Sequence, residues 1–194
     1  MKSLRSILLV AIAFAFIKAA NPLQSTYTVS KEHTVTIHGT SNLHSWDETV
    51  QNVSGSGTVK WNDDGSFDLD AITIKMEVNS IKSDMGSAMN NNTYKALKAD
   101  ANPEITFVLS SPIRSIPAKA YETVFSAKGN LTIAGVTRQI EMQVKVYMPV
   151  KGQLVFDGSQ TIKMTDYGIS PPVALFGTLK TGNEITLNFK TSLQ

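Results

Sequence analysis

The chain alternates apolar and polar residues at a period of two over most of residues 25–192. This spacing is typical of β-strands that bury one face and expose the other. The alternation is clearest in residues 72–78, 105–109 and 140–148, where Ile, Val, Met and Phe are interleaved mainly with Thr, Lys, Glu and Gln. We therefore expect an all-β protein.

One segment, residues 83–99, follows a helical spacing instead. Met85, Met89, Tyr94 and Leu97 recur about every third to fifth position, which places them near one face of a helix. The pattern predicts one short helix that ends before Pro103.

Turn and bulge signals divide the strands. The sequences at 62–65 (Asn-Asp-Asp-Gly) and 133–136 (Ile-Ala-Gly-Val) predict tight hairpins. A change of parity between Leu69 and Ile72 predicts a β-bulge, whereas residues 39–48 break the alternation and are expected to be irregular. The pattern yields about eight strands, and a sheet of that size protects its edges by closing. We expect an eight-stranded antiparallel β-barrel with one inserted short helix, wide enough for packed side chains or one small ligand.

The N-terminus has the order of a secretory signal peptide. Lys2 and Arg5 precede an apolar block over residues 7–17, which the small residues Ala19 and Ala20 follow. We expect residues 1–20 to be a signal peptide, residues 21–194 to form one domain, and the protein to be periplasmic or secreted. A short uncleaved anchor is the alternative. The sequence has no Cys, which excludes disulfides and thiol catalysis.

Composition narrows the class of function. The formal net charge is only +2, from 18 basic and 16 acidic residues. The sequence therefore lacks the excess of positive charge that is typical of proteins that bind nucleic acid. The three histidines, His33, His38 and His44, lack a convergent spacing, so no metal site is predicted. The acidic residues of 63–70 lack the ligand spacing of a calcium loop and fit a solvated hairpin tip. No catalytic motif is present, and we predict a non-enzymatic protein without a cofactor; a lipid enzyme that uses Asp166 is a weaker alternative.

Three segments resemble one known family. Residues 129–137 (Gly-Asn-Leu-Thr-Ile-Ala-Gly-Val-Thr), 103–107 (Pro-Glu-Ile-Thr-Phe) and 166–169 (Asp-Tyr-Gly-Ile) are similar in order and spacing to elements of the YceI family of polyisoprenoid-binding, lipocalin-like proteins. The resemblance covers about residues 25–191. It implies an exported eight-stranded barrel with an inserted helix that holds an isoprenoid lipid, such as a quinone, in an apolar interior. The chain departs from the better-known members at residues 39–46 and at Asn90, Asn91, Asn92 and Tyr94.

The candidate ligand-binding residues are those expected on the inner face of the strands, in the irregular segment and on the helix. Flexible Met and flat aromatic side chains suit a long apolar guest. The alternative is that the same side chains fill the barrel as a dry core. The ligand-binding candidates are Trp46, Met76, Met89, Tyr94, Phe107, Leu109, Phe125, Met142, Val144 and Met164. Trp46 is expected either to cap the entrance or to plug the end of the core, and the helix either to seal the barrel or to contact the guest.

The leading hypothesis is an exported binding protein that holds an isoprenoid or similar apolar lipid, for example a quinone or polyprenol, for storage or transfer. Its expected partners are that lipid and, transiently, a membrane or lipid donor. A structural or stress-related barrel with a filled core is the second hypothesis. An outer-membrane barrel is the third, because the alternation does not say which face points outward. The oligomeric state stays open, a dimer included.

Overall fold

The computed structural model describes residues 24–119 and 121–194. The predicted signal peptide, residues 1–20, lies outside this part of the chain. No helix in the described ranges is long and apolar enough to cross a membrane. The elements, in chain order, are β1 (Gln24–Thr28), β2 (Thr34–Ser41), β3 (Ser45–Val50), β4 (Val53–Trp61), β5 (Ser66–Glu77), the 3₁₀ turn η1 (Val78–Ser80), β6 (Ile81–Lys82), α1 (Ser87–Leu97), β7 (Glu104–Leu109), β8 (Ile113–Pro117), β9 (Thr123–Ile133), β10 (Val136–Tyr147), β11 (Leu154–Lys163), the 3₁₀ turn η2 (Met164–Tyr167), β12 (Val173–Ala174), the short turn η3 (Leu175–Gly177) and β13 (Leu179–Leu193).

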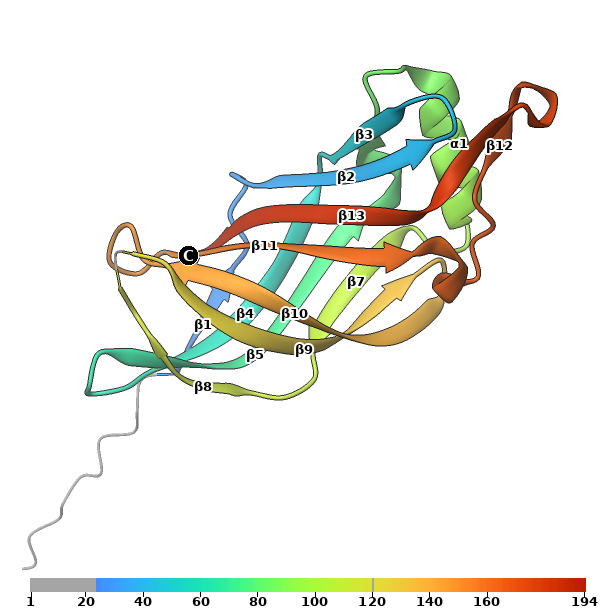
Figure 1. Ribbon diagram of the computed structural model, residues 1–194. Coiled ribbons are helices and arrows are strands. Elements are labelled where there is room, and N and C mark those ends of the chain that lie inside the picture. The colour runs from blue at the N-terminus through green and yellow to red at the C-terminus, as the bar shows by residue number, and fades with distance from the viewer. Residues whose placement is uncertain (1–23, 120) are drawn as a thin grey trace, which may run out of the picture.

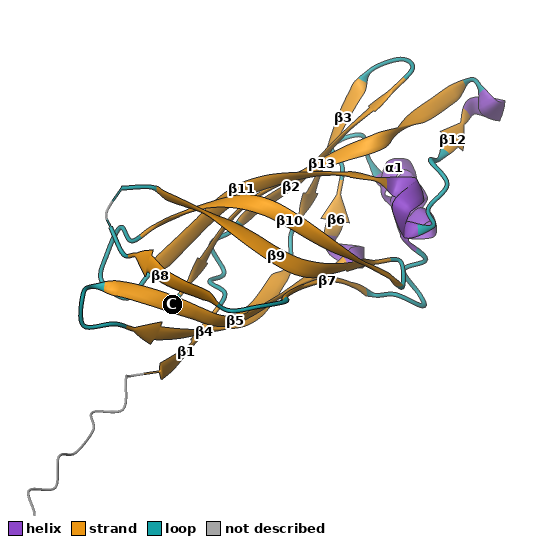
Figure 2. Ribbon diagram, turned by 60° about the horizontal axis from the view of Figure 1, so that its bottom comes forward, coloured by secondary structure: helices purple, strands orange, loops and turns teal. Residues whose placement is uncertain are grey.

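The strands form one curled antiparallel sheet (Figures 1 and 2). Its order is β1-β4-β5-β7-β9-β10-β11-β13-β2-β3-β6, with β8 also paired to β5 and β12 to β13. Backbone groups of Thr28, at the end of β1, and Gln194, just after β13, exchange two hydrogen bonds of 3.0 Å. The first and last strands therefore meet, and the sheet curls around a single interior.

The predicted count of eight strands is wrong, since the described residues form 13 strands. Four of the strands that the count missed, β3, β6, β8 and β12, lie in segments without clear alternation, and β6 and β12 are only two residues long. The segment 39–48, expected to be irregular, is the hairpin of β2 and β3. A two-residue strand is too short to show a period, so neighbouring strands alone fix its conformation.

Two local predictions are confirmed. In the pairing of β4 with β5, Thr58 faces Ala71 and Val59 faces Leu69, so Asp70 is the extra residue of a bulge. Between β9 and β10, Ala134 and Gly135 have φ angles of 49° and 81°. Positive φ at both central positions is the mark of a type I′ hairpin turn, whose twist matches that of the strands.

Helix α1, the predicted short helix, covers one end of the curled sheet (Figure 1). It ends at Lys98, which takes the left-handed conformation with φ 53° and donates its N–H to the last turn. The Tyr94 hydroxyl anchors the helix by donating to the backbone oxygen of Ile81 at 2.8 Å.

The apolar members of the alternation face inward. On β10, Val144 and Val146 are buried, whereas Glu141, Gln143 and Lys145 are exposed. Inside, the buried residues form two clusters, one beside α1 with Trp46, Met76 and Tyr167, and one farther along with Phe67, Leu154 and Phe156. The interior is therefore apolar along its length, and the outer face is polar.

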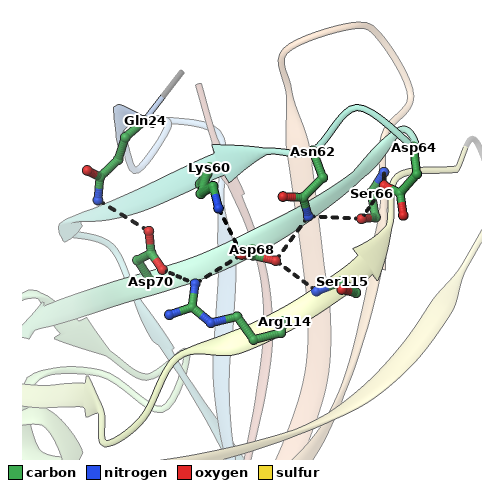
Figure 3. Close-up of polar contacts among 9 residues, drawn as sticks. All are labelled: Gln24, Lys60, Asn62, Asp64, Ser66, Asp68, Asp70, Arg114 and Ser115. Atoms are coloured by element: carbon green, nitrogen blue, oxygen red, sulfur yellow. Dashed lines mark hydrogen bonds and ion pairs between the residues drawn. The ribbon is translucent and has the colours of Figure 1, made fainter. Parts of the chain in front are cut away.

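The end of the sheet away from α1 carries a network of polar contacts around Asp68 (Figure 3). The Asp68 carboxylate is 6% exposed and accepts hydrogen bonds from Ser115 N at 2.9 Å, Asn62 Nδ2 at 3.0 Å and Arg114 Nη1 at 3.0 Å. The Ser115 N–H, followed by Asn62 and Arg114, lowers the pKa of Asp68 to about 2. Asp63 and Asp64 are exposed as expected for a hairpin tip, but the expectation is wrong for Asp68, which fastens β5 to β8.

Candidate functional site

The interior contains an elongated cavity of about 210 Å³. It reaches from α1 into the middle of the curled sheet, and its lining includes members of both apolar clusters. Apolar cavities of about 150 Å³ stay dry and accept a molecule the size of benzene. The cavity therefore offers water-excluding space for part of an apolar guest.

Eight of the ten residues predicted to bind a ligand line this cavity. They come from seven different elements, which the curl of the sheet brings together. These residues are Trp46, Met76, Met89, Phe107, Phe125, Met142, Val144 and Met164.

Tyr94 and Leu109 do not line the cavity. The Tyr94 hydroxyl points to the backbone of β6 and η1, where Lys82 Nζ also donates to it at 2.5 Å. Leu109 packs partly buried against the cluster farther from α1. Tyr94 thus positions the helix, and Leu109 belongs to the surrounding packing.

Trp46 lies flat against the backbone of the neighbouring strand. It pairs with Gly39 across β2 and β3, and a Cβ added at Gly39 would lie 2.2 Å from the indole ring. The ring is 9% exposed, lines the cavity, and donates from Nε1 to Thr40 O at 3.1 Å. Glycine at position 39 is what gives the indole room to form this part of the cavity wall.

The same packing recurs at two other glycines. A Cβ at Gly129 would lie 2.2 Å from the Phe107 ring, and one at Gly158 would lie 2.7 Å from the Phe189 ring. Both rings line the cavity. Aromatic side chains placed on strand glycines therefore shape the cavity in three places.

The cavity reaches the end of the sheet between α1 and the hairpin of β12 and β13. Met89 and Ala96 line it from the helix, and Pro172, Val173 and Leu179 from the hairpin segment. The three elements α1, β3 and β12 lie at this one end of the molecule in both views (Figures 1 and 2). We refer to this end, bounded by residues 89–97 and 172–181, as the cavity mouth.

Two hairpin tips stand beside the cavity mouth and are tied to each other. Asn42 donates from Nδ2 to Thr178 O and accepts from Lys180 N at Oδ1, both at 2.8 Å. The tips expose apolar side chains: Leu43 is 64% exposed and Phe176 is fully exposed.

Glu48 is a polar cavity residue that the sequence did not reveal. It follows Trp46 on the inner face of β3, is only 2% exposed, and lines the cavity. Thr93 Oγ1, on α1, donates to Glu48 Oε1 at 2.6 Å. Burial raises the pKa of the Glu48 carboxyl, and the Thr93 hydrogen bond opposes part of that rise.

Tyr167 is the second missed residue. It lies in η2, is 2% exposed, and lines the cavity. Its hydroxyl is buried and has no hydrogen-bond partner among the described residues. Burial, followed by the neighbouring Asp166, raises the pKa of Tyr167.

Other candidate chemistry does not converge. Within residues 24–119 and 121–194, no three His, Asp or Glu side chains are grouped to hold a metal ion. His38 Nδ1 meets Asp47 Oδ1 at 2.8 Å on the exposed surface. Asp166, the residue of the enzyme alternative, is exposed and is not part of the cavity lining.

Comparison with known proteins gives matches to solved structures of the same fold. A polyisoprenoid-binding domain from Saccharophagus degradans is 12% identical, with a TM-score of 0.68, and the match covers 87% of this chain and 97% of that one. BcnA of Burkholderia cenocepacia is 20% identical with a TM-score of 0.61, covering 82% and 95%. A YceI protein of Campylobacter jejuni is 18% identical with a TM-score of 0.55, covering 75% and 82%.

No curated protein sequence is significantly similar to this chain. The model of the YceI-like domain, in contrast, matches residues 19–193, nearly the whole chain. The three segments at 103–107, 129–137 and 166–169 lie within this match. The chain therefore belongs to the family of YceI-like domains.

Proposed function

We propose that this protein binds an isoprenoid or similar apolar lipid, such as a quinone or polyprenol, in the interior of the curled sheet, for storage or transfer and without bond chemistry. The observation that carries the proposal is the buried apolar cavity, which extends from the cavity mouth into both core clusters. The family supports the proposal, because one structural neighbour is named a polyisoprenoid-binding domain.

Apolar contact supplies a large favourable contribution to the free energy of binding. Each buried methylene group contributes about 0.8 kcal/mol. Ten such groups contribute about 8 kcal/mol, which corresponds to a micromolar Kd before the costs of association are subtracted. No charged contact to the chain of the lipid is needed.

The lining allows the cavity to adapt to its guest. A volume of about 210 Å³ lies below the 300–1,000 Å³ common for ligand sites. Met76, Met89, Met142 and Met164 line the cavity, and unbranched Met side chains change rotamer readily. The same small volume supports the filled-core alternative. That alternative requires that the four Met side chains do not change rotamer to admit a ligand.

Uptake of an offered polyprenol, detected by native mass spectrometry, tests the proposal. Met142→Glu places a charge in the cavity wall, whereas Gln143→Glu places the same charge on the exposed outer face of the same strand. We expect one bound polyprenol in the wild type and in Gln143→Glu, and a loss of at least tenfold in Met142→Glu. Equal uptake by both variants, or none by the wild type, would refute cavity binding.

The proposal includes export and transient membrane contact. The signal-peptide pattern of residues 1–20 and the absence of Cys support a periplasmic or secreted protein. Leu43 and Phe176 place exposed apolar side chains beside the cavity mouth, where a lipid would leave a bilayer. Flotation with phosphatidylcholine vesicles should be reduced by Phe176→Ser; unchanged flotation would remove this contact from the proposal.

A further inference from the structure

The cavity wall is mainly apolar; among the described lining residues, Asn92, Thr93, Gln160, Thr181 and Thr191 are neutral and polar, and Glu48 and Tyr167 are the ionisable ones. Glu48 and Tyr167 are each 2% exposed, and both line the cavity. Burying a carboxyl or hydroxyl group costs free energy unless a partner replaces the lost water. Protein contacts recover only part of that cost here.

Glu48 keeps one oxygen available for a guest. The Thr93 hydroxyl binds Oε1 at 2.6 Å and fixes the carboxyl between β3 and α1. The described residues provide no hydrogen bond to the second oxygen, Oε2. A fixed carboxyl with a free oxygen is an acceptor for a hydroxyl group.

Tyr167 offers a second hydrogen-bonding group from a different wall. It lies in η2, directly after β11, and β13 and β2 separate β11 from β3 in the sheet. Its buried hydroxyl, which has no partner in the described part of the chain, can donate and accept.

The two polar groups share one half of the cavity. Tyr167 belongs to the core cluster beside α1, and Glu48 lies between Trp46 and Val50 of that same cluster. The half farther from α1 is lined mainly by apolar residues such as Phe125, Val144 and Phe156, with the neutral Thr191 beside Phe156. A guest with a polar head and an apolar tail matches this distribution best when its head lies between Glu48 and Tyr167.

Charge limits the head group further. Among the cavity-lining residues that the structure describes, Glu48 is the only ionisable acid or base apart from Tyr167, and Lys and Arg are absent. An anionic head group would be buried without a counter-ion and beside a carboxyl group.

We propose that Glu48 and Tyr167 form a head-group site that accepts a neutral head with two hydrogen-bonding oxygens and rejects an anionic one. This inference rests on the proposed lipid-binding function and specifies its ligand class. The head lies between β3 and η2, and the tail extends toward Phe125 and Phe156.

Three ligands with the same kind of tail test the site. They are 2-geranylgeranyl-hydroquinone, geranylgeranyl monophosphate, and the hydrocarbon phytane, which serves as a reference for the tail alone. Affinities are measured on the delipidated full-length mature protein by displacement of a fluorescent fatty alcohol. We expect the hydroquinone to bind at least tenfold more tightly than the monophosphate, and more tightly than phytane.

The variants assign the effect to the two residues. Tyr167→Phe should weaken hydroquinone binding by about three- to tenfold, the usual effect of one lost hydrogen bond, without affecting phytane. Glu48→Gln removes the charge but keeps a hydrogen-bonding side chain. It should therefore reduce the ratio by which hydroquinone binds more tightly than the monophosphate. Tyr121→Phe is the matched control, because Tyr121 is 66% exposed and does not line the cavity.

The outcomes separate this inference from the function on which it rests. Binding of all three ligands with equal affinity would overturn the head-group site and leave lipid binding intact. An effect of Tyr121→Phe on selectivity as large as that of Tyr167→Phe would also overturn it. Failure of every ligand to bind would overturn the proposed function and the head-group site together.

Discussion

Replacing Gly39 by Ala tests how the cavity wall is built. The added Cβ would lie 2.2, 2.6 and 2.7 Å from three atoms of the Trp46 ring, so the indole must move. Overpacking of this kind costs about 1–3 kcal/mol. The loss of glycine's freedom in the unfolded chain returns about 0.4–1 kcal/mol. We expect Gly39→Ala to lower the free energy of unfolding by about 1–2 kcal/mol.

A double-mutant cycle with Trp46→Leu assigns this cost to the ring. All three atoms nearest the added Cβ belong to Trp46, and leucine lacks them. In the Trp46→Leu background, where only the effect on the unfolded chain remains, Gly39→Ala should therefore raise the free energy of unfolding by about 0.4–1 kcal/mol. Urea unfolding measures the cycle, and thermal unfolding should show a fall of about 2–8 °C in Tm for the single variant.

The same substitution should weaken ligand binding, because the displaced indole moves within the cavity wall. Polyprenol uptake by Gly39→Ala is compared with uptake by the wild type under conditions where both are folded. A cost of Gly39→Ala that is the same with and without the indole would refute the packing of Trp46 on Gly39.

Two further predictions follow from the buried carboxyl groups. Burial raises the pKa of Glu48 in the folded state. The contribution of Glu48 to stability is therefore fully present below the unfolded pKa of about 4.3, where the carboxyl is protonated, and it is lost as pH rises through the raised folded-state pKa. Glu48→Gln should thus unfold at higher urea than the wild type at pH 8, with the gap shrinking toward pH 4; a less stable variant at pH 8 contradicts the burial argument. For Asp68, whose pKa is lowered from 3.8 to about 2, the stability is present above pH 4 and lost as pH falls toward 2. Asp68→Asn should lower the free energy of unfolding by about 2 kcal/mol at pH 7, the usual contribution of hydrogen bonds to a charged group. A urea unfolding curve identical to that of the wild type would show that the network around Asp68 does not stabilise the fold.

The sequence predicts those parts of the molecule in which a side chain's direction follows from its neighbours. Alternation along β10 correctly turns Met142 and Val144 inward, and the tight hairpin expected at residues 133–136 is present. The bulge at Asp70 follows from the change of parity that it creates. Each of these features is encoded within about ten residues.

The parts that the sequence does not predict depend on distant contacts. Glu48 occupies an inward position, but a carboxylate in an alternating strand normally marks the outward face, so segment 39–48 looks irregular. Tyr94 lies on the apolar side of the helix pattern, yet its hydroxyl turns to the Ile81 backbone, because spacing does not fix how the helix rotates over the sheet. Tyr167 lies in a 3₁₀ turn without a period, and only its packing against the core places it in the cavity.

Native mass spectrometry of the mature protein, purified without detergent from its own host and from a foreign one, tests the central claim most directly. Solvent extraction then identifies any bound lipid. We expect a discrete added mass that extracts as an isoprenoid or similar lipid with a neutral head group. A protein of bare polypeptide mass in both preparations, with no uptake of an offered quinone or polyprenol, would contradict the account and indicate a barrel whose interior is a filled core.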